Sequence, residues 1–277
     1  MAEPPIPLEE IYSRLIAAVD SLEGEAAEGL MQELAAQMPA WLEAHWKMLH
    51  SSPSPSRITA CRLQQWYRAK EFPHDQEIPT YWKVRAAMGV AAEPYYLAVL
   101  TAAGLGVWLP TEAFPIGPML AHPDLLAPDF AVELKTTNGW GYKALLENPA
   151  GVVAEEFGHF AQAQLQTAAA DRRWALYIST PADPSMLQGT MRQRKEYGPT
   201  WELPPFYIEW IERNDNEVAR LLERAEMLVK DLASDVPPTP EFDGVEFEPK
   251  KGRRAYPCGY CLWRTRRNQD FPDKETV

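Results

Sequence analysis

The sequence predicts an α/β fold in which a central mixed sheet is flanked by helices, with a helical extension at the N-terminus. Apolar and polar side chains alternate over residues 132–135, as on a strand with one buried face. Apolar residues recur at helical spacing over residues 216–232. The 277-residue chain is long enough to form one enlarged α/β core with appended segments.

Strands and helices alternate along the main part of the chain. Strands are expected at residues 107–116, 120–126, 130–136, 174–179 and 206–212. Helices are expected at residues 56–69, 81–103, 152–170 and 216–232. An Asn-Asp-Asn run from Asn214 can cap the last helix, and the proline-rich residues 236–240 end it. Pro94 is expected to mark a kink or a helix start within the second helix.

Residues 1–50 are predicted to form an acidic helical hairpin, followed by a second domain at residues 51–277. Apolar residues recur at helical spacing over residues 8–50, amid many acids. The Ser and Pro cluster at residues 51–56 indicates a linker, whose Ser56 can cap the next helix. The hairpin is either a simple extension or an acidic surface for a protein partner.

Membrane and secretory classes are disfavoured by the sequence. It contains no run as long as a membrane span, and no basic segment followed by an apolar one at its start. We therefore expect a cytoplasmic protein with no membrane partner.

The net charge of −12 is unusual for a protein that binds nucleic acid, but the basic residues are unevenly distributed. Residues 250–267 hold seven Lys or Arg and no acid, against 20 basic and 39 acidic residues elsewhere. Tyr260 and Trp263 lie among them, where a base can stack. The segment is either a solvated basic tail or a DNA-binding site formed by Arg253, Arg254, Arg264, Arg266 and Arg267.

The most informative stretch is 121–137, which places two acids and a lysine on adjacent strands. Asp124 belongs to the first strand, Glu133 and Lys135 to the second, and the Pro-Asp pair that ends at Asp129 forms the turn. Carboxylate oxygens are the ligands that Mg²⁺ prefers, and bound Mg²⁺ can hold a phosphodiester and help to ionise a water. Lys135 can position or deprotonate that water, or offset charge in the transition state.

The flanking helices supply further candidates. Glu93 lies on an apolar helical stretch, four residues after Gly89. The later helix carries three glutamines, of which we favour Gln162 over Gln164 and Gln166 for holding a water and a phosphate oxygen. His122, two residues before Asp124 on the same strand face, is expected to border the site. His159 is expected to pack or hydrogen-bond locally.

The pattern Asp124-x8-Glu133-x-Lys135, with Arg85-x3-Gly89-x3-Glu93 before it and the glutamine-bearing helix after it, resembles the PD-(D/E)XK nuclease superfamily and its RecB-like exonuclease branch, of CRISPR-associated and phage type. The resemblance implies a restriction-endonuclease-like core and a metal-dependent DNA exonuclease. Its catalytic residues would be Asp124, Glu133, Lys135 and Gln162, with Mg²⁺ or Mn²⁺ held by Glu93, Asp124 and Glu133. The substrate would be DNA with a free end or a single strand, in phage recombination, CRISPR adaptation or DNA repair.

Three cysteines form the second distinctive feature. Some RecB-like exonucleases hold an iron–sulfur cluster with one N-terminal and three C-terminal cysteines, and Cys61, Cys258 and Cys261 resemble three of these four. The fourth is absent, so Asp270 or an outside ligand would have to complete an iron–sulfur or zinc site, or the segment is a metal-free remnant. We expect Cys61 to lie beside Cys258 and Cys261.

Two further classes of function stay open. One is a catalytically inactive DNA-binding or partner-binding protein on the same scaffold. The other is an interaction protein in which the acid and lysine pattern is coincidental and the cysteines form a structural metal site. The first is disfavoured because buried acids beside a lysine are costly to keep without a metal. The second is disfavoured by the flanking helix and glutamines.

Overall fold

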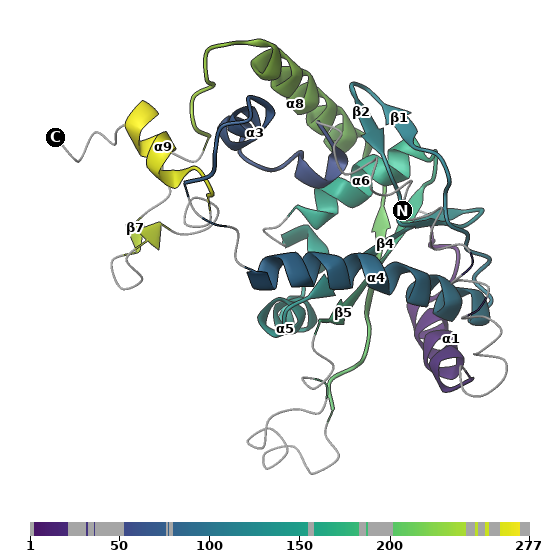
Figure 1. Ribbon diagram of the computed structural model, residues 1–277. Coiled ribbons are helices and arrows are strands. Elements are labelled where there is room, and N and C mark those ends of the chain that lie inside the picture. Colours follow the sequence, from purple (N-terminus) through teal and green to yellow (C-terminus); the bar gives the residue numbers. More distant parts are fainter. Residues whose placement is uncertain are drawn as a thin grey trace.

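The computed structural model describes residues 3–21, 32, 36, 53–75, 77, 80–154, 158–182, 187, 202–241, 247–248, 253–254 and 261–271. Its centre is a four-stranded sheet with strand order β3-β4-β5-β6 (Figure 1). The strands are β3 (Leu125–Leu126), β4 (Phe130–Thr137), β5 (Trp174–Pro181) and β6 (Tyr207–Glu212). Only β4 and β5 pair in parallel, and the other two pairings are antiparallel. The prediction of a central mixed sheet is therefore confirmed.

The first two predicted strands are wrong in extent. β1 (Phe114–Ile116) and β2 (Met119–Ala121) form a separate antiparallel hairpin around Gly117, which has a left-handed φ of 54°. Residues 107–113 make a single bridge, between Trp108 and Leu126, instead of a strand. The expected strand 120–126 is divided between β2 and β3, because Pro123 between them has no N–H to donate to a ladder.

Helices cover both faces of the sheet, as predicted. The helices α1 (Leu8–Ser21) and α4 (Thr80–Ala102) bury apolar residues against one face, where the strands contribute Val132, Leu134 and Ile178. The helices α5 (Gly139–Glu147) and α6 (His159–Ala169) pack on the opposite face, around Ala175 and Tyr177 of β5. Side chains alternate along each strand, so the two clusters lie on opposite sides of one sheet.

A second layer of helices lies outside α6. The helix α8 (Asp215–Ala233) packs against α6 and against α3 (Arg62–Ala69), and the short 3-10 helix η1 (Pro55–Arg57) lies against α6 (Figure 1). As expected, Asn214 caps α8, since its side chain accepts hydrogen bonds from the next turn. In the part of the chain with described coordinates, no helix combines the length and the apolar character that a membrane span requires.

Two predicted helices are interrupted. The prediction at 56–69 is wrong in treating η1 and α3 as one helix, and the prediction at 152–170 covers η2 (Gly151–Ala154) and α6. Before α6, Gly158 adopts a left-handed φ of 84°, and a Cβ there would lie 2.0 Å from the Thr59 hydroxyl. Only glycine allows both this conformation and this approach.

Other helices also differ from the expectation. The helix α4 continues through Pro94, which is neither its start nor its end, because surrounding packing can outweigh the loss of one backbone hydrogen bond. The helices α5 and α9 (Arg264–Asp270) and the small hairpin of β7 (Phe247–Glu248) and β8 (Arg253–Arg254) were not predicted.

The C-terminal segment meets α3 in one apolar cluster, which we call the terminal cluster. Its buried members are Leu63, Trp66, Tyr67 and Trp263. Trp263 donates a hydrogen bond to the Phe72 carbonyl at 3.0 Å, and Tyr67 donates one to Asp270 at 2.6 Å. The C-terminal segment is therefore attached to α3 and to Phe72 by packing and by hydrogen bonds.

The predicted acidic hairpin is described only in its first half. The helix α1 buries Ile11, Leu15 and Ala18 in the same cluster as α4 and the sheet. The second predicted helix falls within residues 22–50, almost all of which lie outside the described residues. A domain boundary near residue 50 stays a prediction, but α1 itself packs into the main core.

We predict that Leu15→Ala lowers the free energy of unfolding of the whole protein by about 2–5 kcal/mol, because it leaves a cavity between α1 and α4. Urea unfolding followed by tryptophan fluorescence measures this change. Ser13→Ala, on the exposed side of α1, should change stability by less than about 0.5 kcal/mol. An unchanged main transition in Leu15→Ala would show that α1 folds independently of the sheet.

Candidate active site at the edge of the sheet

The candidate site lies where β4 loses its neighbour on one side. β3 pairs with β4 through Leu125 and Leu126 only, so the edge of β4 beyond Val132 is open. Asp124 is the residue just before β3, and its Oδ2 accepts a hydrogen bond from the Leu134 backbone N at 2.7 Å. This carboxylate replaces the ladder partner that Leu134 would otherwise have, and it sets Asp124 across from Glu133.

Glu133 is the most deeply buried acid of the site. Its side chain is only 1% exposed, and one carboxylate oxygen, Oε1, forms an ion pair with Lys135 Nζ. The other oxygen, Oε2, is buried and has no hydrogen-bond partner. A buried carboxylate oxygen without a donor is costly, so this atom indicates a missing cationic or hydrogen-bonding ligand.

Glu93 reaches the same place from α4. One turn before it, Gly89 brings the helix close to β4, because a Cβ at this position would lie 3.3 Å from the Thr136 hydroxyl. The charges of Asp124, Lys135 and Glu133 all act on Glu93. Three acids from three segments thus surround one lysine, and we call Glu93, Asp124, Glu133 and Lys135 the acidic site.

Burial and mutual repulsion disfavour the charged forms of these acids. Burial raises the pKa of Glu93 well above its usual range, and Asp124 raises it further. Burial likewise raises the pKa of Glu133, against the opposing effect of Lys135. Burial by itself would lower the pKa of Lys135, but Glu133 and Asp124 outweigh it and the net shift is upward. One lysine therefore compensates only part of the negative charge.

One face of α6 borders the acidic site. Gln166 is buried, donates to the His122 carbonyl at 2.8 Å and lies close enough to Glu133 to lower the pKa of that carboxyl slightly. Gln162 lies one turn earlier on the same face and is half-buried. Gln164 points elsewhere, because it donates to the Glu212 carbonyl at 2.9 Å and accepts from the Asn214 backbone at 2.7 Å.

The glutamine that contacts an acid is therefore Gln166, which the sequence argument ranked below Gln162. The sequence already indicated this alternative, because Gln162 and Gln166 are four residues apart and therefore share a helix face. Gln162 keeps its proposed role as a prediction, because it lies on that face. Asp129 is exposed in the turn between β3 and β4, as expected.

His159 hydrogen-bonds locally, as expected. Its Nδ1 lies 3.1 Å from the Tyr177 hydroxyl, and Tyr177 pairs in register with Glu133 on the neighbouring strand. Burial lowers the pKa of His159 to about 3, and the charge of Lys135 lowers it further. His159 is therefore neutral at physiological pH. His122 borders the site through its backbone carbonyl.

Solved structures of two exonucleases resemble this chain in overall arrangement. The alkaline exonuclease LHK-Exo from Laribacter hongkongensis matches with a TM-score of 0.45 and 18% identity, over 65% of this chain and 87% of that one. A phage-related exonuclease from Haemophilus somnus 129PT matches with a TM-score of 0.45 and 14% identity, over 63% and 81%. No family model and no curated protein matches the sequence. The functional conclusion below therefore depends on the side chains of the site.

The carboxylates of the acidic site are the kind of ligand that Mg²⁺ or Mn²⁺ prefers, but in this structure some of their oxygens contact other groups of the protein. Among the residues that the structure describes, no group of three or more His, Cys, Asp or Glu side chains is arranged to hold a metal as it stands. Glu133 Oε1 is engaged by Lys135, and Asp124 Oδ2 by the Leu134 amide. The unpartnered Glu133 Oε2 fits a cation, and Glu93 is a further carboxylate close enough to act on the same charges.

The structure does not support an iron–sulfur motif. Cys61 and Cys261 both contact the terminal cluster, as the predicted grouping requires, whereas Cys258 lies outside the described residues. Asp270 was considered as a fourth ligand, but it accepts hydrogen bonds from Tyr67 and Arg266. Aromatic packing and these hydrogen bonds attach the C-terminal segment to α3.

The predicted basic DNA-binding residues have mixed surroundings. Arg267 is only 3% exposed, and Arg266 pairs with Asp270 at 3.1 Å and stacks over the Phe72 ring. Arg266 therefore packs on the terminal cluster, and Arg267 is buried. Arg253 and Arg254 form β8 and Arg264 begins α9, and their side chains lie outside the described part of the structure.

We predict that Glu93→Gln raises the melting temperature at neutral pH in the presence of chelator. The folded state holds a proton on Glu93 up to a higher pH than the unfolded state, so wild-type stability falls as pH rises from the ordinary carboxyl range to the raised pKa. Glutamine cannot ionise, so the advantage of the variant should disappear as pH falls to the ordinary carboxyl range. Melting curves across pH measure this difference.

The matched control is Glu112→Gln, an exposed glutamate outside the site, which should leave the melting temperature unchanged. A lower melting temperature for Glu93→Gln at neutral pH would mean that the carboxylate stabilises the fold, against its assignment to a ligand site.

Proposed function

We propose that this protein is a divalent-metal-dependent nuclease that hydrolyses phosphodiester bonds in DNA. The observation that carries the proposal is the unpartnered, buried Glu133 Oε2 within a cluster of acids around a single lysine. Such a cluster is electrostatically unfavourable by itself, and perturbed buried acids of this kind are typical of functional sites.

The roles follow from position. Glu93, Asp124 and Glu133 would hold Mg²⁺ or Mn²⁺, which supplies charge for binding the phosphodiester and lowers the pKa of an attacking water. Lys135, which pairs with Glu133, would orient or deprotonate that water. Gln166 lies beside Glu133 and donates to the His122 carbonyl, and Gln162 on the same face would orient water or a phosphate oxygen.

We infer that the activity is exonucleolytic and acts on DNA with a free end or a single strand. The support is the resemblance of the Asp124, Glu133 and Lys135 pattern, with its flanking helices, to RecB-like exonucleases. Phage recombination, CRISPR adaptation and DNA repair are the processes that this assignment suggests. An iron–sulfur or zinc site at the cysteines is a separate question, which metal analysis of the purified protein answers.

We predict that Asp124→Asn, Glu133→Gln and Lys135→Ala each reduce cleavage of end-labelled DNA in Mg²⁺ or Mn²⁺ by about 100-fold or more, because each removes charge from the reacting centre. Time courses on single-stranded and double-stranded DNA, resolved by gel electrophoresis, measure both rate and polarity. Chelator should abolish wild-type activity.

Asp129→Asn is the matched control for Asp124→Asn, because Asp129 is an exposed turn residue that completes the literal Pro-Asp pair. It should retain full activity. Mn²⁺ at about 100 times its Kd should stabilise the folded wild type by about 2.7 kcal/mol and so raise its melting temperature. The melting temperature of Glu133→Gln should not change. Binding of DNA without cleavage by the wild type would favour an inactive DNA-binding protein on this scaffold.

A further inference from the structure

Arg57 and Arg68 lack the acidic partner that most of the arginines with described side chains have. Arg57 is the last residue of η1, and Arg68 lies in the last turn of α3. Within the described part of the chain, neither side chain forms a hydrogen bond or an ion pair. The arginines with carboxylate partners are Arg14, Arg62, Arg173, Arg213, Arg220, Arg224 and Arg266.

The two unpaired arginines also repel each other. Burial lowers the pKa of Arg57 to about 10, and the positive charge of Arg68 lowers it further. Arg57 is half-buried, and Arg68 is exposed at the end of its helix. Two neighbouring cations without an acidic partner repel each other. The lack of a partner is unusual here, because the protein has a net charge of −12 and therefore more carboxylates than basic groups. The arrangement becomes favourable when an anion lies between or beside them.

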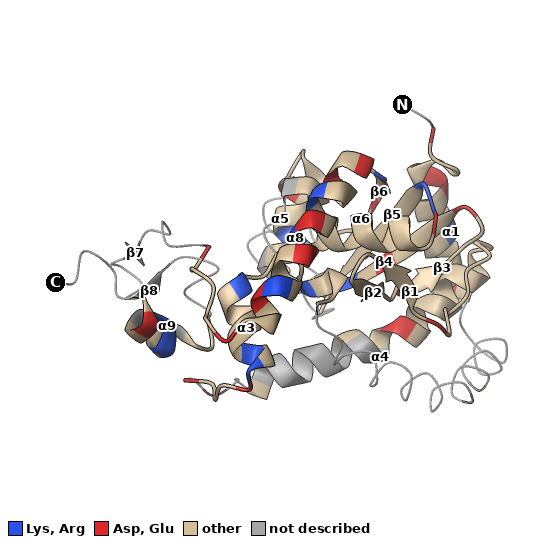
Figure 2. Ribbon diagram, turned by 90° about the horizontal axis from the view of Figure 1, so that it is seen from above, with Lys and Arg blue, Asp and Glu red and all other residues tan. Residues whose placement is uncertain are grey.

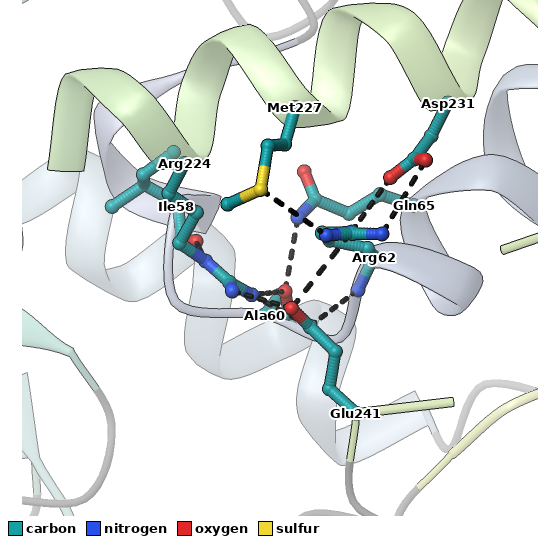
Figure 3. Close-up of polar contacts among 8 residues, drawn as sticks. All are labelled: Ile58, Ala60, Arg62, Gln65, Arg224, Met227, Asp231 and Glu241. Carbon is teal, nitrogen blue, oxygen red and sulfur yellow. Dashed lines mark hydrogen bonds and ion pairs between the residues drawn. The ribbon is translucent and has the colours of Figure 1, made fainter. Parts of the chain in front are cut away.

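The segment that carries Arg57 is held firmly. Arg224 of α8 donates to the Ile58 carbonyl at 2.5 Å and to the Ala60 carbonyl at 2.9 Å (Figure 3). Glu241 accepts from the Arg62 backbone N at 2.9 Å and pairs with Arg224. The charges of this network are used within the protein, and Figure 2 likewise shows basic and acidic residues side by side along α8. Arg57 is next to this network and does not take part in it.

The same segment lies against the walls of the acidic site. η1 packs against α6 and β2, and Ile58 is buried with Met119 of β2 and Ala161 of α6. Two residues after Arg57, Thr59 lies against Gly158, which precedes His159. α6 contributes Gln166 to the acidic site, and β2 leads directly to Asp124. η1 therefore lies against the two elements that carry Gln166 and lead to Asp124.

We propose that Arg57 and Arg68 bind a backbone phosphate of the DNA strand whose scissile bond lies in the acidic site. This inference rests on the proposed function and adds a binding subsite to it. The planar guanidinium group donates two parallel hydrogen bonds to phosphate oxygens, which suits arginine to this role. A protein of net charge −12 with an acidic centre repels DNA, so unpaired cations beside that centre provide the local attraction.

Binding can be measured separately from cleavage. The probe is a short fluorescein-labelled single-stranded DNA, titrated with the full-length protein in chelator at a series of sodium chloride concentrations, and followed by fluorescence anisotropy. Arg57→Gln and Arg68→Gln should each bind more weakly than the wild type. The slope of log K against log salt should become shallower by about 0.7 for each phosphate contact that is lost.

Arg173→Gln is the matched control, because it removes the same charge from an exposed arginine that is paired with Glu212. It should bind DNA like the wild type. Thermal unfolding should show no loss of stability in Arg57→Gln, because the substitution removes a repulsion and breaks no ion pair. Marked destabilisation would instead assign Arg57 a structural role and overturn the proposal.

The remaining outcomes separate this inference from the proposed function. If Arg57→Gln and Arg68→Gln bind DNA like Arg173→Gln, the subsite is wrong, even if the protein cleaves DNA. If binding depends on Arg57 and Arg68 but no cleavage occurs with Mg²⁺ or Mn²⁺, the subsite is supported and the nuclease assignment fails. Equal competition by a polyglutamate peptide would show a site for acidic protein segments and overturn the assignment to DNA phosphate.

Discussion

The hydrogen bond from the Leu134 amide to the Asp124 carboxylate is the contact on which the candidate site depends. It closes the edge of β4 at the point where β3 stops, so no further strand is needed to satisfy that amide. Because the acceptor is an acid instead of a backbone carbonyl, the same contact places a carboxylate across from Glu133. The open edge then gives α4 room to bring in Glu93.

The resulting concentration of negative charge is unfavourable for the fold. Glu93 and Glu133 are removed from water, and Lys135 neutralises only part of their charge. Buried charges remain in proteins when a ligand or a function compensates for their cost. A divalent cation would compensate this charge and would use the free Glu133 Oε2, which links the energetics of the fold to the chemistry of the site.

Some of the arginines that the structure describes hold segments of the protein together, and others have no acidic partner. Around α3 and α8, Arg62 and Arg224 are bound to acids and hold the segment before α3 in place. In the C-terminal segment, Arg266 packs on the terminal cluster. Arg57 is unusual because it has the rigidity of this region without an acidic partner. Local placement of such cations, and not net charge, decides where an acidic protein can attract a polyanion.

The sequence by itself determined the α/β class, the helices around the sheet and the Asp124, Glu133 and Lys135 pattern, because local periodicity and spacing encode which residues share a strand face. Tertiary structure decided the rest. The division between β2 and β3, the helical path through Pro94 and the proximity of Arg57 to Arg68 depend on packing between distant segments. The contact of Gln166 with Glu133 likewise depends on how α6 crosses the sheet, and local sequence does not encode that placement.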